Sequence, residues 1–177
     1  MTDIEPSAEA RQRAAPALER LAALGVAAET HWHRPHFTVE ESRADRGDSK
    51  GHTKNLFLKD KKSRYFLVTV RDDAELDLKG LHRHIGAQGR LSFGSAEKME
   101  ALLGVTPGSV TALAAFNASP DDVRFVIDEA LLAANLVHCH PLTNEATTSL
   151  RPADLMSVMK ACGHDPLILN VEDASPL

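Results

Sequence analysis

Residues 56–70 read Leu-Phe-Leu-Lys-Asp-Lys-Lys-Ser-Arg-Tyr-Phe-Leu-Val-Thr-Val and predict a β-hairpin. The two apolar runs, 56–58 and 65–70, are rich in the aromatic and β-branched residues that favour strands. The polar segment between them, Asp60-Lys61-Lys62-Ser63, has the length and composition of a hairpin connection. We therefore expect these residues to form the first pair of strands in a sheet.

Further strands and isolated helices are expected on both sides of this hairpin. The candidate strands are 26–32, 90–93, 123–128, 136–140 and 167–171. The candidate helices are 7–24, a short helix opened by a capping box at Thr38 and Glu41, 78–85, 95–103 and 152–162. Since strands come in runs rather than alternating with helices, the class is α+β: a single domain with a mixed, mostly antiparallel β-sheet and flanking helices.

Composition narrows the class of protein. Of the 177 residues, 43% are hydrophobic and 25% charged, values close to those of globular domains. The length fits one domain over 1–177, with 1–15 as a helical or partly flexible N-terminal extension. No apolar run approaches the roughly 20 residues of a membrane helix, and the N-terminus lacks a signal peptide pattern. Two cysteines make no disulfide framework. We expect a soluble, cytoplasmic protein without a membrane partner.

Charge is unevenly distributed along the chain. The net charge of −5 argues against a general nucleic-acid binder. Between Arg43 and Arg64, however, eight basic residues face three acidic ones, so this segment carries +5 and the rest −10. Such a segment can hold a phosphate-bearing partner, or it can simply be a solvated lysine-rich hairpin. The basic residues are Arg43, Arg46, Lys50, Lys54, Lys59, Lys61, Lys62 and Arg64.

Motifs for metals, nucleotides and nucleophiles are weak or missing. Of three His-x-His pairs, those in candidate strands could each chelate an ion from one strand face, whereas His82/His84 lies in a segment expected as helix, where a spacing of two does not converge. Neither a third ligand nor a compact zinc signature accompanies the pairs, so they also fit surface or partly buried histidines. There is no Gly-x-Ser-x-Gly, Gly-x-Gly-x-x-Gly or Walker sequence, and Cys139 lies in an apolar run. We expect no metal and no other cofactor. The pairs are His31/His33, His82/His84 and His138/His140.

Three stretches are less generic, although each also fits a structural role as a strand start, a tight turn or a loop. In 51–58, Lys54 begins an apolar strand and shares a face with Leu56 and Leu58, which is costly unless it meets an anion. In 106–112, Gly108 permits a close approach of the backbone to a ligand. In 140–148, small polar residues follow a buried strand.

Together these stretches resemble the YbaK/prolyl-tRNA synthetase-associated editing domain. The similarity spans roughly residues 16–172 and is strongest to the free-standing prolyl-tRNA editing proteins of the ProXp-ala type, which hydrolyse alanine mischarged onto proline tRNA. The motifs that carry it are Lys-Asn-Leu-Phe-Leu at 54–58, Thr-Pro-Gly-Ser-Val-Thr at 106–111 and His-Pro-Leu-Thr-Asn at 140–144 with Thr147, supported by 38–41 and 163–167.

The resemblance implies a mixed sheet with flanking helices, a pocket for the aminoacylated terminal adenosine, and hydrolysis without a metal. It assigns activity above all to Lys54. Apart from the resemblance, Asn55, His140 and Asn144 are further candidates for shaping the pocket or orienting the water, and His140 can equally be a structural histidine. The family loop Gly-x-x-x-Pro corresponds to 108–112, where Ala112 replaces the proline. The expected substrate-binding residues are Gly108, Ser109, Val110, Thr111, Ala112, Asn144 and Thr147.

Hydrolysis of an activated ester needs an attacking water, stabilisation of the oxyanion and proton transfer, so positioning and electrostatics can suffice. We expect Lys54 to hold the terminal phosphate or ribose, amides of 108–110 to face the carbonyl, and the free ribose hydroxyl to orient the water. The partner is the acceptor end of mischarged tRNA(Pro), with prolyl-tRNA synthetase or an elongation factor as further candidates. The tRNA-binding candidates are Arg43, Arg46, Lys50, Lys59, Lys61, Lys62 and Arg64.

Three alternatives stay open from the sequence. Within the family, the substrate can be Cys-tRNA(Pro) instead of Ala-tRNA(Pro). Outside it, the chain can be a non-catalytic tRNA-binding module, or a metal-dependent hydrolase that uses the His-x-His pairs.

Overall fold

The structure is a computed structural model that describes residues 4–35 and 51–174. The helix expected from Thr38, and the candidates Arg43, Arg46 and Lys50, lie outside these residues. Within them, no helix is both long and apolar enough to cross a membrane.

Strands and helices follow one another much as the sequence indicates. In chain order they are α1 (Ala8–Ala23), β1 (Glu29–Trp32), β2 (Thr53–Lys59), β3 (Tyr65–Arg71), the 3-10 helix η1 (Leu81–Arg83), β4 (Ser92–Phe93), α3 (Ala96–Leu103), the 3-10 helix η2 (Ala112–Asn117), β5 (Val123–Asp128), α4 (Glu129–Leu132), β6 (Val137–Cys139), β7 (Ala146–Leu150), α5 (Pro152–Ala161), β8 (Leu167–Leu169) and the 3-10 helix η3 (Glu172–Ala174).

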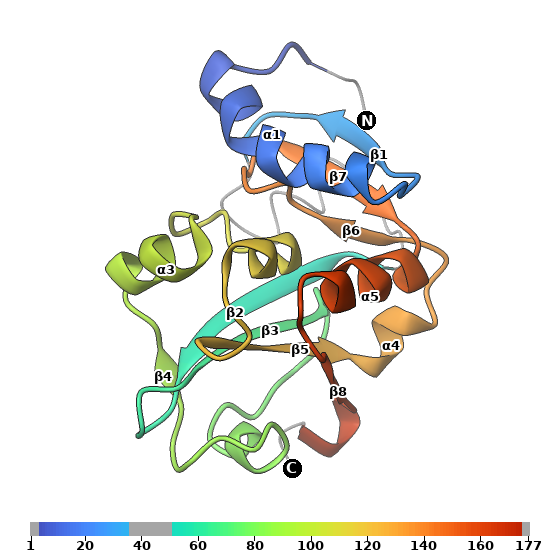
Figure 1. Cartoon of the computed structure of the whole chain (residues 1–177). Coiled ribbons are helices and arrows are strands. Elements are labelled where there is room, and N and C mark those ends of the chain that lie inside the picture. The colour runs from blue at the N-terminus through green and yellow to red at the C-terminus, as the bar shows by residue number, and fades with distance from the viewer. Residues whose placement is uncertain (1–3, 36–50, 175–177) are drawn as a thin grey trace.

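These strands form two sheets, which Figure 1 shows one above the other. The smaller sheet has the order β1-β7-β6 and is antiparallel. The larger has the order β4-β2-β3-β5-β8, in which β2 is antiparallel to β3 and β4, while β3, β5 and β8 are parallel. The α+β class with mostly antiparallel pairing is confirmed, but nothing in the strand pattern indicated the division into two sheets.

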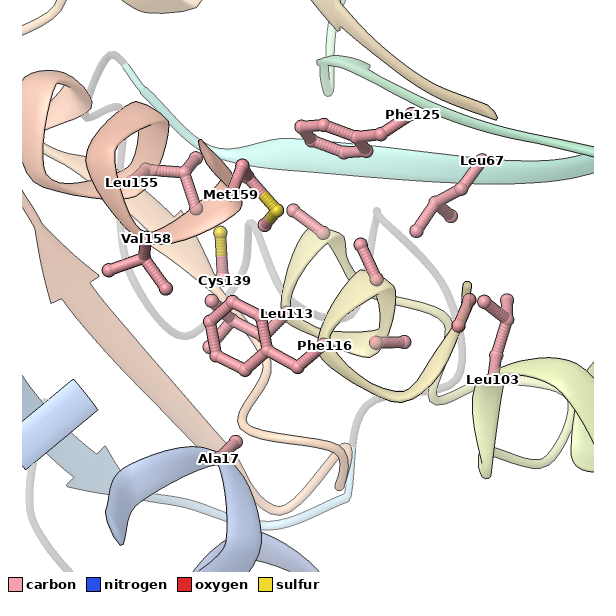
Figure 2. Packing of buried hydrophobic residues seen from close by; sticks show 14 of the residues in the cluster. Ala17, Leu67, Leu103, Leu113, Phe116, Phe125, Cys139, Leu155, Val158 and Met159 are labelled. Carbon is pink, nitrogen blue, oxygen red and sulfur yellow. The ribbon is translucent and has the colours of Figure 1, made fainter. Parts of the chain in front are cut away.

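The predicted hairpin is the centre of the larger sheet and is buried on both faces. β2 pairs with β3 from Thr53 opposite Arg71 to Lys59 opposite Tyr65. Phe57 packs into a core with η2, β6 and α5, whereas Leu58 packs into a second core on the other face. Figure 2 shows the first core, where side chains of η2 gather with those of α5 and β6. Both residues are at most 2% exposed, and such burial is worth about 1.5–3 kcal/mol each.

Helix ends follow their capping signals. Ser7 caps α1, Ser95 caps α3 before Gly104 ends it, and Pro152 takes the first position of α5. Pro16 predicts that the helix either begins near this residue or is kinked at it. α1 begins at Ala8, so Pro16 lies inside the helix. Residues 8–15 of the expected extension form its first half, with Ala10 and Ala14 buried.

Two elements differ from the prediction. Residues 78–85 were expected to form a helix, but only the short η1 is present. Leu81 and Ile85 both enter the second core, and their spacing of four residues resembles the apolar face of a longer helix. The stretch 140–148 also fitted a loop, but its last three residues belong to β7 (Ala146–Leu150). Its Ala146, Thr148 and Leu150 are buried and alternate with half-buried residues, a strand pattern that the small polar side chains obscured.

Candidate active site at the junction of the two sheets

The N-terminal end of β2 is the place where the two sheets meet. Thr53 Oγ1 donates to the carbonyl oxygen of His138 on β6 (2.9 Å), and the His138 amide donates to the carbonyl oxygen of Gly51 (3.0 Å). The rings of His52 and His138 stack with centroids 4.2 Å apart. Gly51 has φ +97°, and a Cβ there would collide with the carbonyl oxygen of Leu136. This junction joins the first sequence motif to β6, the strand that leads into the third motif.

Asn55 presents a fixed carboxamide on the face of β2 that carries Phe57. It lies opposite Thr69, whose fully buried hydroxyl donates to Asn55 Oδ1 at 2.7 Å. The half-buried Asn55 has no acceptor for its Nδ2 group among the residues that the structure describes. The side chain is thus oriented by the sheet with its two N–H donors available to a ligand.

Lys54 points to the other face of the strand. It shares that face with Leu56 and Leu58, as predicted, and its Nζ donates to the carbonyl oxygen of Ala74 rather than to an anion. Consecutive strand residues face opposite ways, so Lys54 and Asn55 do not converge in this structure. Ala74 also lines a cavity of about 510 Å³. Its charged lining is one arginine and five carboxylates, which disfavours the binding of a phosphate there: Arg71, Asp73, Glu75, Asp128, Glu129 and Glu172.

The loop at 106–109 is a type II turn. The Ser109 amide donates to the carbonyl oxygen of Thr106 at 3.0 Å, Pro107 takes the second position, and Gly108 has φ +89° in the third. Of the three amides expected to face a substrate carbonyl, that of Ser109 is therefore engaged in the turn. Those of Gly108 and Val110 have no hydrogen-bond partner within the described part of the chain.

Thr111 and Ala112 support this loop from inside. Thr111 caps η2, since its Oγ1 accepts from the Leu113 amide at 3.3 Å, and both Thr111 and Ala112 are fully buried. Ala112 is the first residue of η2 and follows a residue in extended conformation. That is the backbone setting that proline prefers, so alanine here keeps a geometry that would also accept the family's proline.

The far end of η2 is held by side chains from two helical regions. Arg20 of α1 donates to the carbonyl oxygen of Phe116 at 2.6 Å. The buried His164, which follows α5, donates from Nε2 to the carbonyl oxygens of Ala115 (2.9 Å) and Ala118 (3.1 Å). These contacts fix the helix that follows the Gly108 turn, and they explain the Gly-His sequence at 163–164.

The third motif, at 140–148, is held by a hydrogen bond within its own loop. His140 Nδ1 donates to the carbonyl oxygen of Ala146 at 2.8 Å, which leaves the lone pair of a neutral ring on Nε2. Between His140 and the half-buried Asn144, Leu142 adopts φ +62°, a left-handed conformation that costs about 1–3 kcal/mol and clusters at functional sites.

His33 is the site residue that the motif analysis missed. It is 3% exposed, and its ring lies 6.3 Å from that of His140. Nδ1 donates to the carbonyl oxygen of Arg34 (2.8 Å), so Nε2 accepts from Thr147 Oγ1 (2.9 Å). The Thr147 hydroxyl is thereby committed to His33. Only the pairing of β1 with β7 brings together two residues so far apart in the chain, and no local signal predicts it.

The His-x-His pairs do not gather ligands. His31 lies 3.3 Å from the Glu29 carboxylate, and His82 donates to the carbonyl oxygen of Lys79. Among residues 4–35 and 51–174, no three His, Cys, Asp or Glu side chains are placed to hold a metal ion.

The remaining basic candidates lie at the opposite end of β2. Lys59, Lys61, Lys62 and Arg64 are at the hairpin turn, roughly 20 Å from Lys54 at the usual rise per strand residue (Figure 1). Arg64 is already bound there to Asp60 through Nε and NH2, both at 2.8 Å.

Comparison with known proteins agrees with this geometry. Residues 33–158 match the family model described as the aminoacyl-tRNA editing domain. The chain is 44% identical over 159 residues to prolyl-tRNA synthetase associated domain-containing protein 1 of Bos taurus, covering 87% of this chain and 92% of the relative. It is 36% identical over 134 residues to the prolyl-tRNA editing protein ProX of Acetoanaerobium sticklandii, covering 75% and 81%.

A solved structure provisionally described as a trans-editing enzyme for prolyl-tRNA synthetase has the same fold, with a TM-score of 0.70, 23% identity, and coverage of 94% of this chain and 99% of the other. The sequence motifs, the fold and the family match agree, and the chain belongs to the aminoacyl-tRNA editing domain family.

Proposed function

We propose that this protein hydrolyses alanine from mischarged Ala-tRNA(Pro), acting as a free-standing editing enzyme. The observation that carries the proposal is the junction of the two sheets, where hydrogen bonds join motif 51–58 to β6 and one core joins β6 to the loop at 108–112. The names of the relatives support it, since one is called a prolyl-tRNA editing protein.

The site favours a mechanism without a protein nucleophile. Burial raises the pKa of the Cys139 thiol to about 12, so this cysteine stays protonated and packs into the core. The ester of an aminoacyl-tRNA is activated, and water attack needs mainly orientation and a place for the negative charge. The amides of Gly108 and Val110 supply two donors for the developing oxyanion.

Asn55 and His140 are assigned to orientation of the substrate and the attacking water. The Nδ2 group of Asn55 is aimed by Thr69 and can donate to the ribose or the carbonyl of the substrate. The carbonyl oxygen of Ala146 fixes the ring of His140, which we assign to shaping the pocket and orienting the attacking water. The free hydroxyl of the terminal ribose completes the orientation of the water.

Lys54 is proposed to bind the terminal phosphate or ribose. To do so its ammonium exchanges the neutral carbonyl oxygen of Ala74 for an anionic or hydroxyl oxygen of the substrate. The long aliphatic stem of lysine permits this change without movement of the strand.

We assign specificity for the aminoacyl group to the small side chains of the loop at 108–112. Gly108, the almost buried Ser109 and the buried Ala112 form a floor of backbone and small side chains. Such a floor accepts alanine, whereas proline is larger and is excluded sterically. Cysteine is close to alanine in size, so Cys-tRNA(Pro) is the second candidate substrate. Prolyl-tRNA synthetase or an elongation factor remains a proposed partner.

The test is a deacylation assay on Ala-, Cys-, Ser- and Pro-tRNA(Pro), with and without EDTA. We expect Ala-tRNA(Pro) to be cleaved fastest, Pro-tRNA(Pro) to survive, and chelation to change neither rate. Equal cleavage of the alanyl and prolyl esters would overturn the specificity. Binding without cleavage would indicate a tRNA-binding module, and activity lost to EDTA and restored by zinc would indicate a metal-dependent hydrolase.

A further inference from the structure

The turn between β2 and β3 is bound to a second segment of the chain. The Lys61 amide donates to the carbonyl oxygen of Gln88 (3.2 Å), and Arg64 NH2 donates to that of Gly86 (2.9 Å). We call residues 59–64 and 86–90 together the basic lobe. Figure 1 shows the turn beside β4, at the end of β2 away from β6. The lobe contains five cationic side chains and one carboxylate: Lys59, Lys61, Lys62, Arg64, Arg90 and Asp60.

The single carboxylate of the lobe is turned inward. Asp60 is 2% exposed, and its Oδ1 accepts from the amides of Lys62 (2.8 Å) and Arg64 (3.0 Å). Its Oδ2 accepts from the Gln88 amide (2.9 Å) and from Arg64 Nε (2.8 Å). Burial alone would raise the pKa of Asp60, but these hydrogen bonds prevail and lower it to about 2. Asp60 therefore stays charged and holds both segments without being presented to a ligand.

Lys61 is held from a second direction. Gly89 has φ +73°, and a Cβ on it would come within 2.8 Å of Lys61 Cδ. The aliphatic stem of Lys61 thus lies directly on the backbone of Gly89, which limits the directions that its ammonium can take. Holding a lysine stem in place reduces the side-chain entropy that a ligand must remove on binding.

The other cations of the lobe are not neutralised by the protein. Lys61, Lys62 and Arg90 are exposed, and neither they nor the half-buried Lys59 has an ion-pair partner within the described residues. Arg64 differs, because Asp60 and Gly86 already occupy its guanidinium. Four like charges without an ion-pair partner give this turn a positive potential that attracts an anionic ligand.

We infer that the basic lobe binds phosphates of the acceptor stem, at a distance from the aminoacyl end. This inference rests on the proposed function, which places the 3′ end of the RNA at the sheet junction. The lobe is roughly 20 Å from Lys54, a distance that spans several nucleotides of an RNA strand. The contact therefore falls on phosphates beyond the esterified adenosine and not on the aminoacyl end itself. An acidic protein surface is the competing partner, and the test below separates the two.

The experiment compares Lys61→Ala/Lys62→Ala with the charge-matched control Arg13→Ala/Lys160→Ala, whose residues are exposed on α1 and α5. Three substrates or ligands are used: Ala-tRNA(Pro), an alanylated CCA trinucleotide and uncharged tRNA(Pro). We expect the lobe variant to lose about tenfold in kcat/KM on Ala-tRNA(Pro) at low salt, and less than twofold on the trinucleotide. Its slope of log affinity against log salt for uncharged tRNA should flatten by roughly 2. The control should match the wild type throughout.

Equal losses on tRNA and trinucleotide, or an unchanged salt slope, would overturn the inference, and the second result would favour a protein partner. If the wild type cleaves neither substrate, the proposed function fails. The salt slope on uncharged tRNA then still decides whether the lobe binds RNA.

Discussion

The two ends of β2 are built on opposite electrostatic principles, although they belong to one strand of seven residues. At the sheet junction, neutral hydroxyl, carboxamide and backbone groups bond one another, within the larger sheet in the pair of Thr69 and Asn55 and between the sheets in the pair of Thr53 and His138. At the basic lobe, exposed cations surround one buried carboxylate. Neutral donors and acceptors act at hydrogen-bond distance, so they can recognise the shape of an ester. Charges without an ion-pair partner attract a phosphate backbone over several ångströms.

The largest effect should come from the turn at the junction end. Gly108→Val places a branched side chain at φ +89° on the proposed pocket floor and displaces the donors at 108 and 110. We expect a loss of about a hundredfold in kcat/KM toward Ala-tRNA(Pro), in the range for removal of one oxyanion donor. Gly25→Val is the matched control, because Gly25 has φ +69° with no atom within 4 Å of its would-be Cβ. If both variants lose activity in proportion to stability, Gly108 has no special place in the site.

A smaller loss should follow from removing the positive charge of Lys54, the second residue of β2. Lys54→Ala leaves the strand and its core partners intact but removes the ammonium now bound to Ala74. We expect deacylation to fall at least about tenfold, equivalent to about 1.4 kcal/mol of transition-state stabilisation. Lys160→Ala serves as the control for a lost positive charge. Wild-type rates in the Lys54 variant, with an unchanged circular dichroism spectrum, would remove Lys54 from the mechanism.

At the lobe end, the effect should be on stability and should depend on pH. Asp60 has a pKa of about 2 against an ordinary value of 3.8, so its charge stabilises the folded state above about pH 4. That contribution is lost as the pH falls from about 4 toward 2. Asp60→Asn should lower the free energy of unfolding at pH 7 by about 1–2 kcal/mol, and the two urea curves should converge near pH 2.

The exposed Asp121→Asn is the control for this measurement. A constant difference between the Asp60 variant and the wild type from pH 7 to pH 2 would show that packing, rather than the carboxylate charge, stabilises the lobe.

Local pattern was a reliable guide where the signal depends on neighbouring residues. The hairpin at 56–70, the caps Ser95 and Gly104, and Pro152 at the start of α5 all appear as predicted. The type II turn likewise follows from Pro107 and Gly108. Local pattern did not predict β7 (Ala146–Leu150). This strand pairs with β1 on one side and β6 on the other, so small polar side chains are sufficient for it to form.

By itself, the sequence determined the class of fold, the order of most strands and helices, and the three motifs that identify the family. These properties depend on propensity, spacing and turn chemistry within a few residues. Only the tertiary structure decided that the strands divide into two sheets, that Lys54 bonds the carbonyl oxygen of Ala74, and that His33 accepts from Thr147. It also decided that Asp60 faces inward while the lysines around it stay unpaired. Such contacts join residues that the chain separates widely, and their partners are set by packing of the whole core, which no local pattern encodes.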